Sequence, residues 1–267
     1  MSHIVRRVQK NPRPPDGTQA IRRAAAALRA VAKSGPQGAG ASDVAQAQGL
    51  ARSTAHRILK CLIDEGLVEH DDGGRRYRLG PLVHELGLVP ASAAIEAAHW
   101  RPCVEAVARQ TGATAYLMRR SGLESVCVVK ADGASMVRFV PVEAGQRRLL
   151  GVGAGAIALL SALQPDRIEE VLELITPGLA AWPRITPARL RDAVRQVHRT
   201  GVAISRGAVV KDGFGMGIVI PAAGGAVPHL ALSIAAHAST VTDAAIAKWR
   251  QVLIERLNRH PAMAGPG

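Results

Sequence analysis

The stretch from Leu50 to Glu65 constrains the fold of this chain more than any other. Apolar residues recur in it at helical spacing, and they are Ala55, Ile58, Leu59 and Leu62. Cationic, imidazole and hydroxyl groups fall on the opposite face, at Arg52, Ser53, His56, Arg57 and Lys60. The pattern predicts an amphipathic helix whose polar face suits phosphates and base edges. Taken alone, it fits a solvated basic face equally well.

The segment before this helix favours the DNA-binding interpretation. An Ala-rich helix should begin with Thr18 as its N-cap and end before Gly35 and Pro36, with an apolar stripe of Ile21, Ala24, Ala25, Leu28, Val31 and Ala32. A short helix should follow from Ser42, stopped by Gly49. A short helix, a glycine-containing turn and a second helix with a polar outer face together predict a helix-turn-helix.

The segment after the helix predicts a β-hairpin. Residues 67–70 and 75–79 are strand-like, and the turn residues 71–74 separate them. With Tyr77 and Leu79 facing inward, Arg76 and Arg78 should point outward and form a basic wing. The combination predicts a winged helix-turn-helix over residues 18–80, preceded by a flexible basic arm at residues 1–17.

The charge balance agrees with a polyanionic partner. The 267 residues hold 34 Lys and Arg against 21 Asp and Glu, and the excess is densest in residues 1–80, which carry 14 against 7. The cysteines, Cys61, Cys103 and Cys127, have neither metal-ligand nor disulfide-framework spacing, which favours a reducing cytoplasm. No apolar run is long enough to cross a membrane, so we expect no membrane association.

Specific strings in the chain resemble the IclR family of bacterial transcriptional regulators. In the N-terminal half they are Gly49-Leu-Ala-Arg-Ser-Thr-Ala-His-Arg-Ile-Leu, Asp64-Glu-Gly-Leu-Val-Glu and Tyr77-Arg-Leu-Gly. Further on, His99-Trp-Arg-Pro-Cys-Val-Glu-Ala-Val-Ala-Arg-Gln-Thr-Gly resembles the helix that opens the effector-binding domain of that family. The resemblance covers residues 18–258 and implies a GAF-like topology for the second domain. It also implies a linker that helps the protein to dimerise, although an internal packing helix fits residues 81–98 equally well.

The second half of the chain predicts an α+β domain. We expect helices at residues 95–110, 165–176, 187–200 and 243–258, with another after the glycine-rich segment that starts at Leu149. Strands should lie at residues 114–118, 125–130, 136–142, 202–206, 214–221 and 230–236. The predicted fold is therefore an α+β two-domain protein, with the linker helix at residues 81–98, the GAF-like effector-binding domain at 99–260 and a tail at 261–267.

Gly151-Val-Gly-Ala-Gly-Ala is the segment that most suggests a ligand, because glycines before a helix let backbone N–H groups approach an anion. It matches no nucleotide-binding motif, so tight packing explains it as well. The resemblance implies an effector pocket here, at Arg138, Leu149, Gly151, Val152, Gly153, Ala154, Met216, Gly217 and Ser233. Many relatives carry polar residues in place of Leu150 and Val152 and a cysteine in place of Gly217, so this pocket should be more apolar than usual.

Nothing else in the sequence assembles into catalysis. No serine lies in a nucleophile elbow, and the nine histidines form no metal-binding pair. The sequence offers too few aromatic residues for a platform that binds single-stranded nucleic acid. We therefore expect neither an enzyme nor a cofactor or metal.

These observations predict a dimeric or tetrameric regulator, acting as a repressor, that binds a palindromic double-stranded operator and responds to a small carboxylate or a more apolar effector. Arg52, Ser53, Thr54 and Arg57 should enter the major groove, while His56 and Lys60 meet phosphates. The wing residues Arg75, Arg76 and Arg78 should meet the backbone or minor groove. Two alternatives remain, namely a ligand-independent DNA-binding dimer and an enzyme with its site in the glycine loop.

Overall fold

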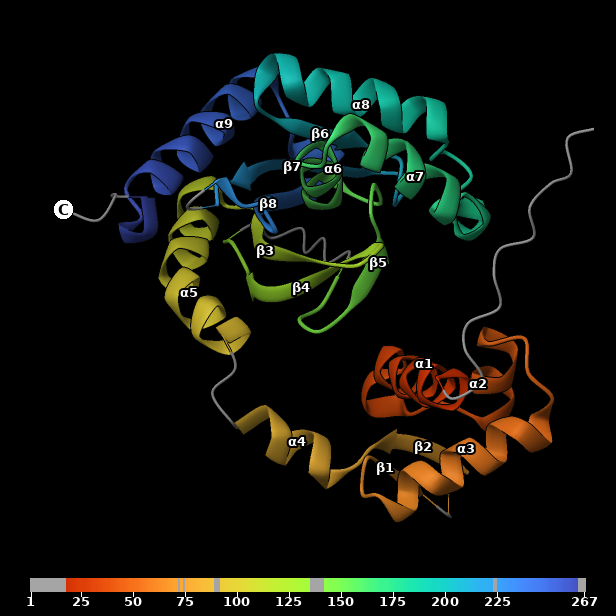
Figure 1. Cartoon of the computed structure of the whole chain (residues 1–267). Coiled ribbons are helices and arrows are strands. Elements are labelled where there is room, and N and C mark those ends of the chain that lie inside the picture. Colours follow the sequence, from red (N-terminus) through yellow and green to blue (C-terminus); the bar gives the residue numbers. More distant parts are fainter. Residues whose placement is uncertain are drawn as a thin grey trace, which may run out of the picture. The chain divides into compact units, whose positions relative to one another are not determined.

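A computed structural model divides the chain into two compact units, Met1–Pro90 and Ala91–Gly267 (Figure 1). It describes residues 18–71, 73, 75–88, 92–134, 142–222 and 225–263. The expected N-terminal arm, Arg138, most of the strand expected at residues 136–142 and the end of the tail lie outside the described residues. Each unit is considered separately below.

The first unit is a winged helix-turn-helix, as the sequence predicts. Its elements are α1 (Gln19–Lys33), η1 (Gly35–Gln37), α2 (Ala41–Ala47), α3 (Arg52–Asp64), β1 (Val68–Asp71), β2 (Arg76–Leu79) and α4 (Pro81–Leu88). β1 and β2 pair antiparallel, with Val68 opposite Leu79 and His70 opposite Tyr77. Gly49 has a φ of 61°, which lets the chain turn sharply between α2 and α3.

A small core holds these helices to the wing. Its buried members include Ala27, Val31, Val44, Leu59, Leu62, Val68 and Tyr77. Three residues expected to face inward do not. Ala32, near the end of α1, is exposed. Ile21 is 70% exposed because it lies in the first turns of α1, which extend past the core, and Leu79 is 39% exposed because it ends β2 at the edge of the core.

The second unit contains one six-stranded sheet and helices on both faces. Its elements are α5 (Ser92–Thr111), β3 (Thr114–Ser121), β4 (Glu124–Ala131), β5 (Arg147–Leu149), α6 (Ala154–Ser161), α7 (Pro165–Ile175), η2 (Thr176–Ala181), α8 (Pro187–Thr200), β6 (Ala203–Arg206), β7 (Gly213–Ile220), β8 (Leu230–His237), η4 (Ala238–Thr240), α9 (Asp243–Asn258) and η5 (Pro261–Met263). The predicted helices are found within a few residues of their expected bounds. The described residues of the expected linker, 81–88 and 92–98, belong to α4 and to the beginning of α5.

The strand order is β5-β4-β3-β8-β7-β6, and every recorded pairing is antiparallel. β3 and β4 form the predicted hairpin around Gly122. β5 was not predicted, because its three residues are Arg147, Arg148 and Leu149, which lack the apolar alternation of a half-buried strand.

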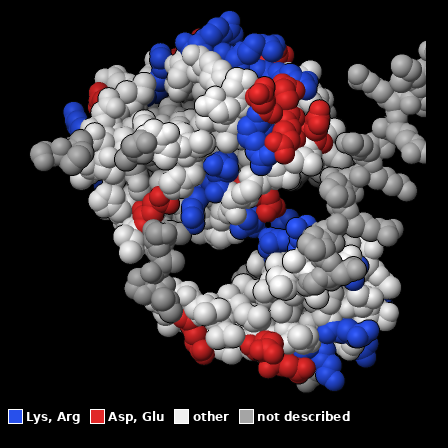
Figure 2. Space-filling view, viewed as in Figure 1, with Lys and Arg blue, Asp and Glu red and all other residues white. Residues whose placement is uncertain are grey.

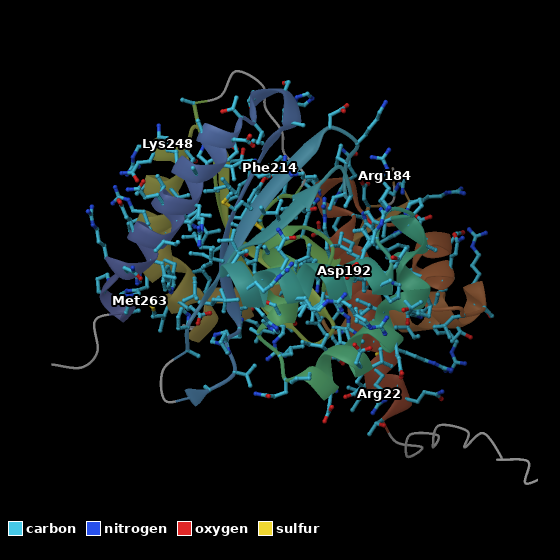
Figure 3. The ribbon with its side chains drawn as sticks, turned by 90° about the horizontal axis from the view of Figure 1, so that it is seen from above. Arg22, Arg184, Asp192, Phe214, Lys248 and Met263 are labelled. Atoms are coloured by element: carbon cyan, nitrogen blue, oxygen red, sulfur yellow. The ribbon has the colours of Figure 1, made fainter. Side chains whose placement is uncertain are left out.

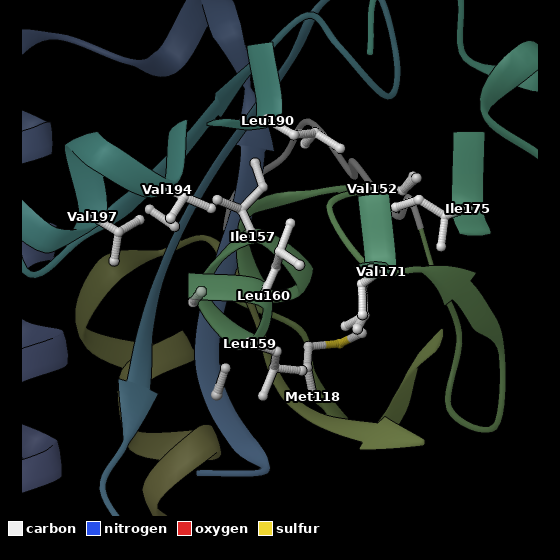
Figure 4. Packing of buried hydrophobic residues seen from close by; sticks show 14 of the residues in the cluster. Met118, Val152, Ile157, Leu159, Leu160, Val171, Ile175, Leu190, Val194 and Val197 are labelled. Carbon is white, nitrogen blue, oxygen red and sulfur yellow. The ribbon is translucent and has the colours of Figure 1, made fainter. Parts of the chain in front are cut away.

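Two apolar layers flank the sheet. α5 and α9 cover one face, where Phe214 and Trp249 approach with ring centroids 5.8 Å apart. α6, α7 and α8 cover the other face, and Figure 4 shows Ile157 and Leu160 of α6 among Val171, Leu190 and Val194. The positions of α8 and α9 relative to β7 can be followed in Figure 3 from the labels Asp192, Lys248 and Phe214.

Small residues let α6 approach the sheet closely. A Cβ atom on Gly217 would lie 3.0 Å from the carbonyl group of Ala154 and 3.1 Å from the Gly155 nitrogen. One on Gly155 would lie 2.7 Å from Met118 Cγ and 2.8 Å from Ser233 Oγ. The absence of side chains at Gly155 and Gly217 therefore lets the beginning of α6 pack directly on β7 and β8.

Candidate DNA-binding surface and effector cavity

The polar face of α3 is open to solvent. Ala55, Leu59 and Leu62 are buried on one side of the helix. Arg52, Ser53, His56, Arg57 and Lys60 are exposed, while Thr54 is half-buried. Within the described part of the chain, the cations Arg52, Arg57 and Lys60 enter no ion pair, and Figure 2 shows Lys and Arg side chains gathered on the side of the unit where α3 lies. Their charges are therefore available to a partner.

The first turn of α3 also favours an anion. Its N-cap is Ala51, so no side chain caps the free N–H groups, and the first turn contains no acidic residue. The negative charges of the stretch lie at its other end, on Asp64 and Glu65. The helix dipole and the side-chain charges therefore both place the positive end at Arg52.

The wing arginines are not equivalent. Arg76 Nη1 lies 3.6 Å from Asp43 Oδ2 of α2. Arg78 donates from Nε to the Pro36 carbonyl at 2.9 Å, and its Nη1 lies 3.2 Å from Asp71 Oδ2. Arg75 is exposed and pairs with no acidic side chain among the described residues. Two of the three predicted wing cations thus already bind other groups of the unit, which the sequence pattern alone did not reveal.

The second unit has a cavity between the sheet and the beginning of α6. Its volume is about 70 Å³. β3, β5, β6, β7 and β8 all contribute to it, together with the loop before α6 and the loop after β6. The lining is mostly apolar, and its polar side chains are Tyr116, Arg148, Ser205 and Ser233.

The cavity gathers some of the residues predicted for an effector. Val152, Gly153, Ala154 and Ser233 line it. Leu149 instead approaches Gly178, Gly151 faces Leu190, and Gly217 packs against Ala154. Met216 is buried on the opposite face of the sheet, with α5 and α9. These four do not line the cavity, because alternation along the strands and the close packing of α6 direct them elsewhere.

The sequence analysis missed Arg148, Tyr116 and Ser205 as cavity residues. Arg148 is half-buried, and among the described residues no carboxylate pairs with it. Burial lowers the pKa of Arg148, because a guanidinium that is partly removed from water loses some of its hydration. The sequence offers two signals for these residues, namely the paired cations at residues 147–148 and the alternation of Tyr116 with Met118. They indicate a shared cavity only once residues 147–149 are recognised as the strand β5.

Tyr116 places a hydroxyl near this cation. The hydroxyl is buried, and among the described residues it has no hydrogen-bond partner. Burial, reinforced by the nearby Cys127, Asp132 and Glu143, raises the pKa of Tyr116 and keeps it a neutral donor. A cation, a neutral donor and an apolar wall are together suited to a small carboxylate.

Among the described residues, no metal-binding cluster accompanies the cavity. Within the described residues, no group of three or more His, Cys, Asp or Glu side chains is placed to hold a metal ion. Cys127, near the cavity, is buried, and burial raises its pKa to about 12, so it is no nucleophile at neutral pH. The described helices also include none long and apolar enough to cross a membrane.

Comparison with known families matches both units. The IclR helix-turn-helix domain model matches residues 20–72, and the model of the bacterial transcriptional regulator IclR C-terminal domain matches residues 92–258. This chain belongs to the IclR family. It is a transcriptional regulator with a DNA-binding helix-turn-helix domain and a C-terminal effector-binding domain, and the family consists of regulators rather than enzymes.

Individual IclR-family proteins agree with this assignment. The HTH-type transcriptional regulator Rv1719 of Mycobacterium tuberculosis is 32% identical over 190 residues, which cover 71% of this chain and 72% of the relative. The crystal structure of an IclR regulator from Alicyclobacillus acidocaldarius matches with a TM-score of 0.74 at 24% identity, covering 92% of this chain and 98% of the other. An IclR homologue from Microbacterium hydrocarbonoxydans, complexed with 4-hydroxybenzoate, matches with a TM-score of 0.69 at 21% identity, covering 93% of this chain and 100% of the other.

Proposed function

We propose that this IclR-family regulator represses transcription by binding a palindromic operator through α3 and the wing. The observation that carries this proposal is the row of exposed, unpaired cations on α3, at Arg52, Arg57 and Lys60. Arg52, Ser53, Thr54 and Arg57 contact base edges in the major groove, and His56 and Lys60 contact phosphates. Arg75 contributes most of the binding by the wing, because Arg76 and Arg78 already have partners.

The regulator acts in the cytoplasm as a homodimer or tetramer. Exposed apolar side chains in the first unit support self-association, since Ile21, Leu86 and Leu88 are 70%, 58% and 68% exposed. A two-fold dimer of two DNA-binding domains, each spanning residues 18–80, requires a roughly palindromic operator. Light scattering of the full chain, together with selection of bound DNA fragments, tests both points.

The effector is a small organic carboxylate with an apolar body, bound by the domain at residues 99–260. The observation that carries this part is Arg148, half-buried and without a described carboxylate partner in an otherwise apolar cavity. The unpartnered Tyr116 hydroxyl and the uncapped first turn of α6 supply further donors. The family resemblance to a homologue complexed with 4-hydroxybenzoate supports an aromatic acid as the first compound to test.

The binding energy of the effector shifts the regulator towards an arrangement that releases DNA, and the shift cannot exceed the difference in affinity between the two arrangements. Operator release measured by fluorescence anisotropy, with 4-hydroxybenzoate, benzoate and the neutral benzamide, tests this proposal. We expect release by a carboxylate and none by the amide of the same shape.

A second candidate function is DNA binding without any effector. The small cavity favours it, because about 70 Å³ is less than half of the roughly 150 Å³ of an engineered cavity that binds benzene. If no carboxylate in a broad panel either releases the operator or raises the melting temperature of the full chain, this second function replaces the first.

A further inference from the structure

The wing and the recognition helix meet at one pair of side chains, Tyr77 and His56. Tyr77 lies on β2, and its hydroxyl oxygen is 3.4 Å from Nδ1 of His56 on α3. The two residues are 21 positions apart in the sequence, so the contact joins two separate DNA-binding elements of the unit. No other hydrogen bond recorded between described side chains connects α3 to the wing strands.

Tyr77 is held firmly by the fold. It is only 5% exposed. Its backbone N–H donates to the Ala39 carbonyl and its carbonyl accepts from the Ala39 N–H, both at 2.9 Å. The ring of His70 lies beside it, with centroids 4.6 Å apart. The hydroxyl therefore occupies a position set by the core and the loop before α2, and it can restrict a more exposed neighbour.

His56 is that neighbour. It is exposed on the polar face of α3, adjacent in sequence to Arg57. When Nδ1 accepts from the Tyr77 hydroxyl, the proton of the neutral imidazole resides on Nε2. When the ring is protonated, Nδ1 donates to the Tyr77 oxygen and Nε2 still carries a proton. In both of these states Nε2 is a donor that is free to meet an acceptor. A neutral ring protonated on Nδ1 can also donate to the Tyr77 oxygen, but a phosphate oxygen beside Nε2 disfavours that tautomer.

We propose that Tyr77 is a positioning residue for DNA recognition, which orients His56 so that its Nε2–H donates to a phosphate oxygen of the operator. This inference rests on the proposed role of α3 as the recognition helix. Fixing the imidazole before binding removes the rotational freedom that it would otherwise lose in the complex. Tyr77 thus acts through His56, without touching DNA itself.

A double-mutant cycle tests the pair in the full-length protein, with operator affinity as the readout. Tyr77→Phe keeps the buried ring and removes only the hydroxyl. We expect it to weaken operator binding by about three- to tenfold, the range for loss of one neutral hydrogen bond, while the melting temperature stays within about a degree or two. In a His56→Ala background, the same substitution should have no further effect on affinity. His84→Ala, at an exposed histidine of α4, serves as the control and should not weaken binding.

Each outcome has a distinct meaning. If Tyr77→Phe weakens binding equally with and without His56, the hydroxyl acts through the general structure of the unit and the proposal is overturned. If Tyr77→Phe has no effect while Arg57→Ala weakens binding, α3 is the recognition helix but Tyr77 does not position His56. If neither Arg57→Ala nor His56→Ala changes affinity, the role of α3 itself is wrong, and the proposal falls with it.

Discussion

The guanidinium of Arg76 lies 3.6 Å from the carboxylate of Asp43, which joins the second strand of the wing to the first helix of the helix-turn-helix. Both side chains are about half exposed, so the ion pair adds little to stability. Its main consequence is electrostatic, because it neutralises one of the cations that the sequence assigns to DNA.

This relationship predicts unequal effects for two neighbouring arginines. Arg75→Ala should weaken binding to all DNA sequences similarly and reduce the salt dependence of log K by about one unit of slope, since one phosphate contact is lost. Arg76→Ala should have a smaller effect on both quantities. Affinity measured over a range of salt concentrations checks this, and a larger loss for Arg76→Ala than for Arg75→Ala would show that the Asp43 pair breaks on binding.

The candidate effector cavity gives a second prediction. Arg148→Gln removes the cation and keeps a shorter, uncharged polar side chain, so it should raise the Kd of a carboxylate effector by about tenfold or more, the worth of a charge-assisted hydrogen bond. Operator affinity without effector should be unchanged. Calorimetry with the wild type and the variant measures the difference. Equal affinities would place the carboxylate elsewhere in the domain.

The close approach of α6 to β7 gives a third prediction. Gly217→Val introduces atoms where the Ala154 carbonyl group and the Gly155 nitrogen already lie 3.0–3.1 Å from an added Cβ. It should lower the free energy of unfolding by about 1–3 kcal/mol, and Gly217→Ala by less. The tryptophans, Trp100, Trp182 and Trp249, all lie in the second unit, so their fluorescence in urea reports this unit. If both variants were as stable as the wild type, the close approach of α6 to β7 at Gly217 would be contradicted.

His260 gives a fourth prediction, which concerns pH. Its ring stacks on Trp100 with centroids 3.6 Å apart, Nδ1 accepts from the Ala262 N–H, and Nε2 bonds the His99 carbonyl. Burial lowers the pKa of His260 below its usual 6.5, although the bond to His99 opposes the shift. The unfolded chain therefore binds the proton more readily than the folded one.

The contribution of His260 to stability should be complete above pH 6.5 and decline as the pH falls through its lowered folded pKa. Urea midpoints from tryptophan fluorescence between pH 8 and pH 5 measure this decline. The variant His260→Gln should lose part of the pH dependence. If His260→Gln keeps the full pH dependence of the wild type, other groups cause the decline in stability.

The sequence predicts the elements of both units well where periodicity is long and the ends are marked. The bounds of α8 and α9 agree with expectation because Thr186 and Thr242 cap their first turns and apolar residues recur through both helices. α3 has no capping side chain and is found from its apolar residues alone, which recur at helical spacing. The three-residue strand β5 escapes prediction, since only its pairing with β4 makes Arg147–Leu149 a strand.

The sites are less predictable because they depend on partners distant in sequence. The pairing of Arg76 with Asp43 and the contact of Tyr77 with His56 follow from how the wing folds against the helices. Arg148 of β5 and Tyr116 of β3 reach one cavity only after β4 pairs between these two strands. Local glycine content identified the beginning of α6, but it could not distinguish Gly153, which lines the cavity, from Gly217, which serves packing.

The most direct test of this account is the operator affinity of Arg57→Ala, compared with Arg199→Ala on the exposed face of α8 as a matched control. If α3 reads the major groove, Arg57→Ala should weaken specific binding by about 1–3 kcal/mol and relax the preference at one base position, while Arg199→Ala leaves both unchanged. Unchanged operator affinity for Arg57→Ala, in a protein that still binds its operator, would contradict the assignment of α3 as the recognition helix.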